Sequence, residues 1–117
     1  MIAHIVLFRP KPDLTSDQLR SFAQSIKATI DGSEVLSRGT VGKSAAIDAG
    51  YSRHLDNSTY PFAAVLEFES QEDLVKYLRK PEHQTLGRLF WEYCDGTVVT
   101  EFHSEHLHNV DVDWFLA

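Results

Sequence analysis

The segment Tyr77-Leu-Arg-Lys-Pro-Glu-His83 decides how the second half of the chain folds, because it forces a break between two helices. Pro81 has no amide hydrogen and its ring clashes with a preceding helical turn. A helix that reaches it must therefore end or kink, whereas a new helix can begin there. We predict one helix from Ser70 to Leu78, capped by the Ser70 hydroxyl, and a second from Pro81 to about Tyr93.

The same segment carries two groups suited to proton chemistry, the phenol of Tyr77 and the imidazole of His83. His83 falls in the first turn of the second helix, where the positive helix end, Arg79 and Lys80 all disfavour a further positive charge. Glu82 opposes this effect. We expect a neutral imidazole near pH 7, as a general base requires. The alternative is structural: a surface histidine and a core tyrosine at a joint between helices.

Two stretches predict the central strands of a sheet, Met1–Arg9 and Tyr60–Phe68, because both their odd and their even positions are largely apolar. A strand with one face in water would alternate between apolar and polar residues. A further strand is predicted from Thr97 to about Glu105, after the turn signal Asp95-Gly96. Both faces of the central strands must therefore be covered.

The segment between the two central strands predicts one helix and a weaker strand. Thr15 and Gln18 have the spacing of a capping box, and apolar residues recur every three or four positions after them, so we predict an amphipathic helix over 15–30. Glycines interrupt the pattern between residues 33 and 59. An irregular edge strand within 35–47 and an exposed loop over 48–59 fit this stretch, but its boundaries stay open.

The predicted order of elements is that of an α+β, ferredoxin-like βαββαβ fold with a four-stranded antiparallel sheet. Both crossovers must be right-handed, so the helices cover one face of the sheet. Because the central strands are apolar on both faces, we expect a second copy of the chain to pack its sheet on the first. The expected assembly is a homodimer, a dimeric α/β barrel with the helices outside.

We divide the chain into a domain over residues 1–105 and a C-terminal tail over residues 106–117. The tail is too apolar to be a solvated end, so we expect it to dock on the domain or on the partner subunit. The side chains that indicate this are Val110, Val112, Trp114, Phe115 and Leu116.

The length, charge and cysteine content of the chain limit the classes of function that it can have. The 117 residues fit one compact domain. The net charge of −6 and the pI near 5.4 argue against nucleic acid or an anionic membrane as a partner, since both require a basic face. The single cysteine, Cys94, predicts a buried thiol in a reducing compartment. The N-terminal stretch has no basic leader, and no apolar run reaches about 18 residues, so we expect a cytoplasmic protein.

The remaining histidine, cysteine and carboxylate residues of the sequence do not predict a metal site or a cofactor site. The spacing of the residues nearest to a metal-binding set matches neither a zinc site nor a two-histidine, one-carboxylate site. These residues are His103, His106 and His108, with Glu101 and Glu105. The sequence also contains no nucleophile elbow and no cofactor-binding motif. We therefore expect a protein that works without a metal or cofactor.

Three motifs in this order resemble the stress-responsive A/B barrel domain family, a dimeric α+β barrel group that includes a plant polyketide cyclase. The resemblance covers roughly residues 1–104. It rests on His4-Ile-Val-Leu-Phe8, Val65-Leu-Glu-Phe-Glu-Ser70 and the segment from Tyr77 to His83. It implies the barrel fold, although most members of the group have no known activity.

The resemblance also implies roles for individual residues. In the cyclase a histidine and a tyrosine with the spacing of His83 and Tyr77 form the catalytic pair, the histidine as base and the tyrosine orienting the substrate carbonyl. His4 matches a strand histidine that faces the cavity. Phe62 stands where the cyclase has another cavity histidine, so the pocket differs. We take His4, Phe62 and Phe8 as substrate-binding residues.

Three hypotheses for the function follow. The first is a cofactor-free enzyme, resembling a cyclase, isomerase or monooxygenase, that acts on a small hydrophobic carbonyl compound with His83 as base and Tyr77 as hydrogen-bond donor. The second is a barrel that binds a small hydrophobic ligand without chemistry. The third is a stress-related dimeric scaffold. A cavity of about 300 Å³ beside these residues favours the first two, and a filled interior favours the third.

Overall fold

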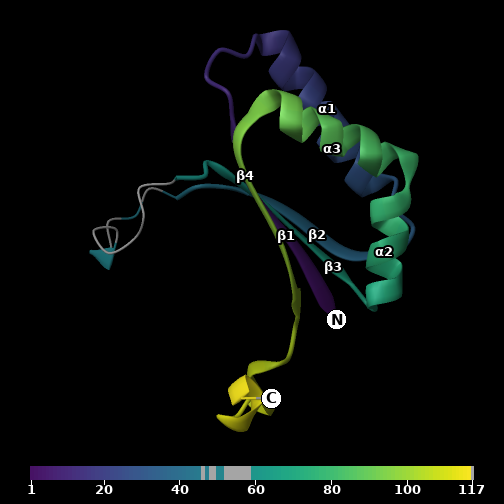
Figure 1. Cartoon of the computed structure of the whole chain (residues 1–117), viewed down its shortest axis with the longest axis vertical. Coiled ribbons are helices and arrows are strands. Elements are labelled where there is room, and N and C mark those ends of the chain that lie inside the picture. Colours follow the sequence, from purple (N-terminus) through teal and green to yellow (C-terminus); the bar gives the residue numbers. More distant parts are fainter. Residues whose placement is uncertain (46, 48–49, 52–58, 117) are drawn as a thin grey trace.

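The computed structural model describes residues 1–45, 47, 50–51 and 59–116. Its elements follow the predicted order, with the second helix divided in two at Pro81 (Figure 1). They are β1 (Ile2–Pro10), α1 (Ser16–Asp31), β2 (Leu36–Lys43), β3 (Phe62–Phe68), α2 (Gln71–Arg79), α3 (Pro81–Tyr93) and β4 (Cys94–His103), followed by the 3-10 turns η2 (Leu107–Asn109) and η3 (Asp113–Leu116). The α+β, ferredoxin-like fold is confirmed.

The four strands form one antiparallel sheet in the order β2-β3-β1-β4, so the two strands predicted to be central are central. Along β1, His4 lies between Leu66 of β3 and Glu101 of β4. The helices α1, α2 and α3 lie on one side of this sheet (Figure 1). The site described below lies on that helix-covered face.

The helix ends follow the local signals. The Thr15 hydroxyl accepts a hydrogen bond from the Gln18 amide, and the Gln18 side chain accepts one from the Thr15 amide, so the predicted capping box is confirmed. The Ser70 hydroxyl accepts a hydrogen bond from the Asp73 amide and caps α2. Pro81 occupies the first turn of α3, as predicted. None of the helices in the described ranges is both long and apolar enough to cross a membrane.

The prediction of a turn at Asp95-Gly96 is wrong, because α3 passes directly into β4 at Cys94. The Arg9 side chain occupies the space beside this passage. Its Nε donates to the Asp95 carboxylate at 2.7 Å, and a Cβ added to Gly96 would lie 2.5 Å from its Nη2. Asp95 and Gly96 are therefore the residues that accommodate Arg9 rather than turn residues.

The irregular edge strand predicted within 35–47 is confirmed as β2, whose pairing with β3 shifts in register between Leu36 and Arg38. Most of the loop expected over residues 48–59 lies outside the described residues, which omit 48–49 and 52–58.

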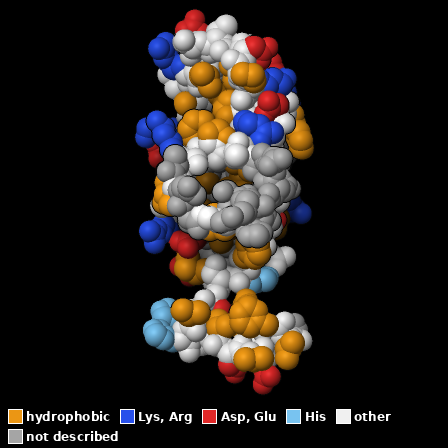
Figure 2. Space-filling view, turned by 90° about the vertical axis from the view of Figure 1, so that its left-hand side faces the viewer, with side chains coloured by type: hydrophobic (Ala, Val, Ile, Leu, Met, Phe, Trp, Pro, Cys, Tyr) orange, Lys and Arg blue, Asp and Glu red, His pale blue; other side chains and the backbone are white. Residues whose placement is uncertain are grey.

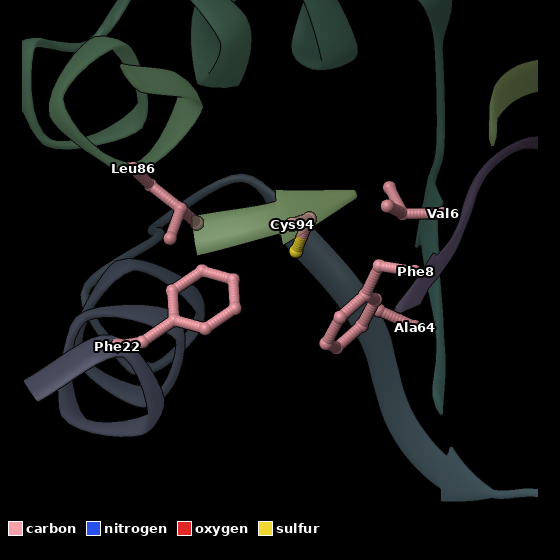
Figure 3. Close-up of a cluster of buried hydrophobic side chains, with 6 residues drawn as sticks. All are labelled: Val6, Phe8, Phe22, Ala64, Leu86 and Cys94. Carbon is pink, nitrogen blue, oxygen red and sulfur yellow. The ribbon is translucent and has the colours of Figure 1, made fainter. Parts of the chain in front are cut away.

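Two clusters of buried side chains hold the helices on the sheet. The first is shown in Figure 3 and consists of Val6, Phe8, Phe22, Ala64, Leu86 and Cys94. The second consists of Ile2, Leu66, Phe68, Leu74 and Tyr77. Each large apolar side chain that is fully buried contributes about 1.5–3 kcal/mol. His4 lies between Ile2 and Val6 on the same face of β1, so it joins the two clusters.

The opposite face of the sheet, which we call the open face, carries none of the helices α1–α3 (Figure 1) and is apolar along most of the two central strands. The strand register assigns to it the apolar residues Ala3, Ile5, Leu7, Ala63, Val65, Val98 and Phe102, together with the polar residues Arg38, Thr40, Glu67 and Thr100. Phe102 is 55% exposed. The two-sided apolar pattern of the central strands is therefore confirmed, with one side buried by helices and the other not covered by them.

Candidate active site

A pocket of about 310 Å³ lies on the helix-covered face, between β1 and β4 on one side and α2 and α3 on the other. Apolar side chains make up most of its lining. They are Val6, Leu78, Leu86, Phe90, Trp91 and Val99. The ionisable exceptions are His4, His83 and Glu101. Two imidazoles and a carboxylate therefore share one small, mostly apolar space.

The half-buried imidazole of His83 lies in the first turn of α3, where the break at Pro81 positions it. Burial lowers the pKa of His83 below its usual value, and the nearby His4 lowers it further, while a hydrogen bond to the backbone of Leu78 opposes both effects. The predicted direction of this pKa is confirmed. The causes are burial and His4, rather than the helix end and the flanking cations.

His4 is paired with Glu101 across the β1–β4 ladder. The His4 Nδ1 lies 2.9 Å from the Glu101 Oε1, with the imidazole side chain 5% exposed and the glutamate side chain 40% exposed. A carboxylate oxygen can only accept, so the His4 Nδ1 carries a hydrogen and donates it to Glu101, which fixes the orientation of the ring. The sequence indicates Glu101 only as a possible metal ligand, not as a partner of His4. The sequence feature that could have predicted this pair is a histidine on a central strand together with a glutamate on the last strand.

Tyr77 contacts both histidines but does not line their pocket. It is 2% exposed, and its ring centroid lies 4.9 Å from that of His83 and 6.3 Å from that of His4. It lines instead a neighbouring hollow of about 260 Å³ at the helix break, with Lys80 and Pro81. Burial raises the pKa of Tyr77 to about 12, so its hydroxyl keeps its proton near neutral pH. Within the described part of the chain, this hydroxyl has no hydrogen-bond partner.

Phe8 and Phe62 lie in another part of the molecule. Their rings stack with centroids 5.4 Å apart, and both line a separate pocket of about 430 Å³ between α1 and the β2–β3 side of the sheet. The structure therefore brings together three of the five predicted site residues, His4, Tyr77 and His83, and leaves these two phenylalanines apart from them.

Residues 2–104 match the family described as the Stress responsive A/B Barrel Domain. The chain belongs to this family. The match spans all four strands, so the A/B barrel domain includes every residue of the histidine pocket. No match to the chain was found among curated proteins.

Solved structures similar to this A/B barrel domain share its fold at low sequence identity. An Arabidopsis thaliana protein is 17% identical with a TM-score of 0.72, covering 92% of this chain and 98% of its own. A hydroxynitrile lyase from Passiflora edulis is 19% identical with a TM-score of 0.68, covering 86% and 90%. A dimeric ferredoxin-like protein of unknown function from Thermobifida fusca is 22% identical with a TM-score of 0.66, covering 86% and 88%. At these identities the likeness concerns the fold alone.

Near the C-terminus the rings of His106 and His108 stack with centroids 4.8 Å apart. Glu105 accepts hydrogen bonds from the His106 amide and the Asn109 side chain, and the His106 Nδ1 accepts one from the His108 amide. In the ranges that the structure describes, no three His, Cys, Asp or Glu side chains form a group able to hold a metal ion.

Proposed function

We propose that this A/B barrel domain is a cofactor-free acid–base enzyme of the cyclase or isomerase type, acting on a small hydrophobic carbonyl compound. The observation that carries the proposal is the pocket of about 310 Å³ in which two imidazoles and a carboxylate interrupt an apolar lining. An apolar pocket with a few convergent polar groups is the common form of a small-molecule site. His83 is the proposed general base, because its lowered pKa keeps the imidazole neutral near pH 7.

The proposed reaction begins with proton removal next to a carbonyl. His83 takes the proton, and the electron pair of the broken C–H bond moves onto the carbonyl oxygen to form an enolate. In an isomerase the enolate takes the proton back at another position. In a cyclase the enolate carbon attacks a second carbonyl of the same molecule, and the new alkoxide receives the proton from His83. The mostly apolar lining lowers the local dielectric constant, which strengthens the electrostatic interactions in the pocket.

Two neighbours support His83 in this proposal. Tyr77 is the proposed hydrogen-bond donor to the developing oxyanion, because its ring contacts that of His83; a substrate that reaches its hydroxyl extends from the histidine pocket toward the neighbouring hollow. Among the described residues this hydroxyl has no hydrogen-bond partner, and it adjoins the hollow at the helix break, so it is free to donate to a substrate oxygen. His4 binds the substrate through Nε2, with its ring oriented by Glu101 at Nδ1. The Passiflora edulis neighbour, named a hydroxynitrile lyase, is one enzyme with this fold. The fold alone does not specify an activity, so the proposal for this chain rests on the residues of its pocket.

A second candidate function is ligand binding without chemistry. The larger pocket of about 430 Å³ favours it, because phenylalanine, leucine and isoleucine side chains dominate its lining and its charged residues are Lys27 and Asp31. This would be the site for the predicted ligand contacts of Phe8 and Phe62. The two pockets together favour either function over a stress-related scaffold with a filled interior.

The proposal includes a homodimer in a reducing, cytoplasmic setting. The open face supports the dimer, because apolar side chains on a central strand require cover, and the Thermobifida fusca neighbour is described as dimeric. Burial raises the pKa of the Cys94 thiol, which supports an unreactive structural cysteine. No nucleic acid, membrane, metal or cofactor is part of the proposed mechanism.

The test of the proposed chemistry needs no knowledge of the natural substrate. The purified protein is incubated in heavy water with a set of small hydrophobic ketones, and exchange of the hydrogens next to the carbonyl is followed by NMR. A general base in the pocket accelerates this exchange, and His83→Ala should lower it on the order of 10²-fold.

His103→Ala is the matched control, because His103 is an exposed histidine that does not line the pocket. Its exchange rate should equal that of the unchanged protein. Ketones that bind without accelerated exchange would favour the second candidate function. Equal acceleration by the unchanged protein and by His83→Ala would contradict the assignment of the base.

A further inference from the structure

The C-terminal segment from Leu107 to Leu116, which we call the arm, is the most exposed apolar part of the described chain. After β4 the Ser104 amide donates to the Met1 carbonyl at 2.9 Å, and the chain then leaves the sheet (Figure 1). Four large apolar side chains of the arm are at least 72% exposed. They are Leu107, Val112, Phe115 and Leu116. Single exposed apolar residues are ordinary, but a contiguous group of this kind marks an interaction surface.

The arm has its own local structure, which makes it a preformed surface. The Trp114 amide donates to the Asp111 carboxylate at 3.0 Å, and the Trp114 and Phe115 rings meet edge to face with centroids 5.1 Å apart. Backbone hydrogen bonds close the turns η2 and η3. An ordered apolar surface loses less conformational entropy on docking than a flexible chain would lose.

The direction of the arm points to the side where a second sheet would lie. Figure 2 views the molecule from the side opposite the helices, and hydrophobic side chains of the arm, at the bottom, face the viewer. The arm continues from β4, which also contributes Val98 and Phe102 to the open face. The radius of gyration is 16.1 Å, against about 13 Å for a compact domain of this length. The chain alone is thus more extended than a self-contained domain.

We propose that the arm docks on a second copy of this chain, beside the open face of that copy's sheet. This proposal rests on the homodimer proposed above and adds to it a specific element of the interface. Sheets that pack face to face lie about 10 Å apart, a distance that a ten-residue segment spans easily. In a twofold dimer each copy supplies one arm and receives one, so both arms are covered at once. The arm and the open face then form a continuous apolar interface.

Photocrosslinking tests directly whether the arm contacts a second copy of the chain. Phe115→p-benzoylphenylalanine places a photoreactive side chain in the arm of the full chain, and a mixture of ¹⁴N- and ¹⁵N-labelled protein is irradiated. We expect covalent species of twice the 13.3 kDa of one chain that contain both isotopes. The same replacement at Glu82, which is exposed on the helix side at the start of α3, is the control and should give none. Crosslinks confined to single chains would overturn the proposal.

Light scattering of the same samples separates the two proposals. A mass of one chain at micromolar concentration would contradict the homodimer and the arm together. A mass of two chains without crosslinks between copies would leave the homodimer and overturn the arm alone. As a second measurement, Phe115→Ser with Leu116→Ser should raise the dimer dissociation constant at least tenfold, whereas Asp113→Ser in the same turn should leave it unchanged.

Discussion

At the scale of single residues, the proposed chemistry depends on His83. Replacing it with alanine should lower the rate on any ketone found by deuterium exchange on the order of 10²-fold or more, because general-base assistance is lost. The fold and the dimer should remain, since the side chain is only half-buried. Turnover, thermal melting and light scattering of His83→Ala check this expectation. A variant that keeps the full rate would rule out the catalytic role.

The lowered pKa of His83 predicts how the rate depends on pH. A general base works only when it is unprotonated, so the rate should fall as the pH drops through this pKa, with a midpoint below 6.5. The contribution to stability has the same sign. The unfolded imidazole binds a proton more readily than the folded one, so this contribution is present above pH 6.5 and is lost as the pH falls toward the folded pKa. A rate profile measured across the acid range would contradict the assignment if its midpoint lay above 6.5.

Tyr77 allows the roles of its hydroxyl and its ring to be separated. Tyr77→Phe should lower the rate about fivefold, the value of roughly one hydrogen bond. It should leave the melting temperature unchanged, because the hydroxyl has no partner in the described part of the chain. Tyr77→Ala should cost about 3–5 kcal/mol of unfolding free energy as a large-to-small core change. Urea unfolding and turnover of both variants check this, and an unchanged rate for Tyr77→Phe would assign Tyr77 a structural role alone.

At the scale of elements, the β1–β4 ladder places His4 against Glu101, so their interaction is a property of strand register. A double-mutant cycle with His4→Phe and Glu101→Leu should give a coupling free energy of about 1 kcal/mol, since the Glu101 side chain is 40% exposed and solvent screens the pair. Urea unfolding of the four proteins measures the coupling. A value within error of zero would mean that the pair contributes nothing to stability in solution.

The start of α2 provides a second element-scale prediction. Ser70→Ala removes the hydroxyl that accepts a hydrogen bond from the Asp73 amide, and should lower the unfolding free energy by about 1 kcal/mol. Ser21→Ala is the control, because Ser21 is an exposed serine inside α1 and should change stability little. Equal midpoints of urea unfolding for the two variants would show that the cap is not stabilising.

At the scale of the whole molecule, the open face should hold two copies together. Val65→Lys places a charge among the apolar residues of this face, and an interface of roughly 2,000 Å² would bury this charge at a large desolvation cost. Light scattering should show the mass falling to the 13.3 kDa of one chain at micromolar concentration. Arg20→Glu, on the exposed surface of α1, should leave the larger mass unchanged. A dimer that survives Val65→Lys would place the interface elsewhere.

Much of this architecture could be read from the sequence, because its signals are local. The capping box at Thr15, the cap at Ser70 and the break at Pro81 each depend on residues within four positions of one another. The two-sided apolar pattern of the central strands likewise follows from alternation along each strand. These signals also bring Tyr77 and His83 to one helix break, where the structure places their rings in contact.

By itself, the sequence determined the order of elements, the helix break and the identity of the central strands. Only the tertiary structure decided that Glu101 pairs with His4, 97 positions away, and that Phe8 and Phe62 line a pocket of their own. It also decided that Asp95 and Gly96 accommodate Arg9 instead of forming a turn. Caps, breaks and alternation are set by neighbours along the chain. Contacts between distant strands depend on their register, which packing of the whole sheet selects.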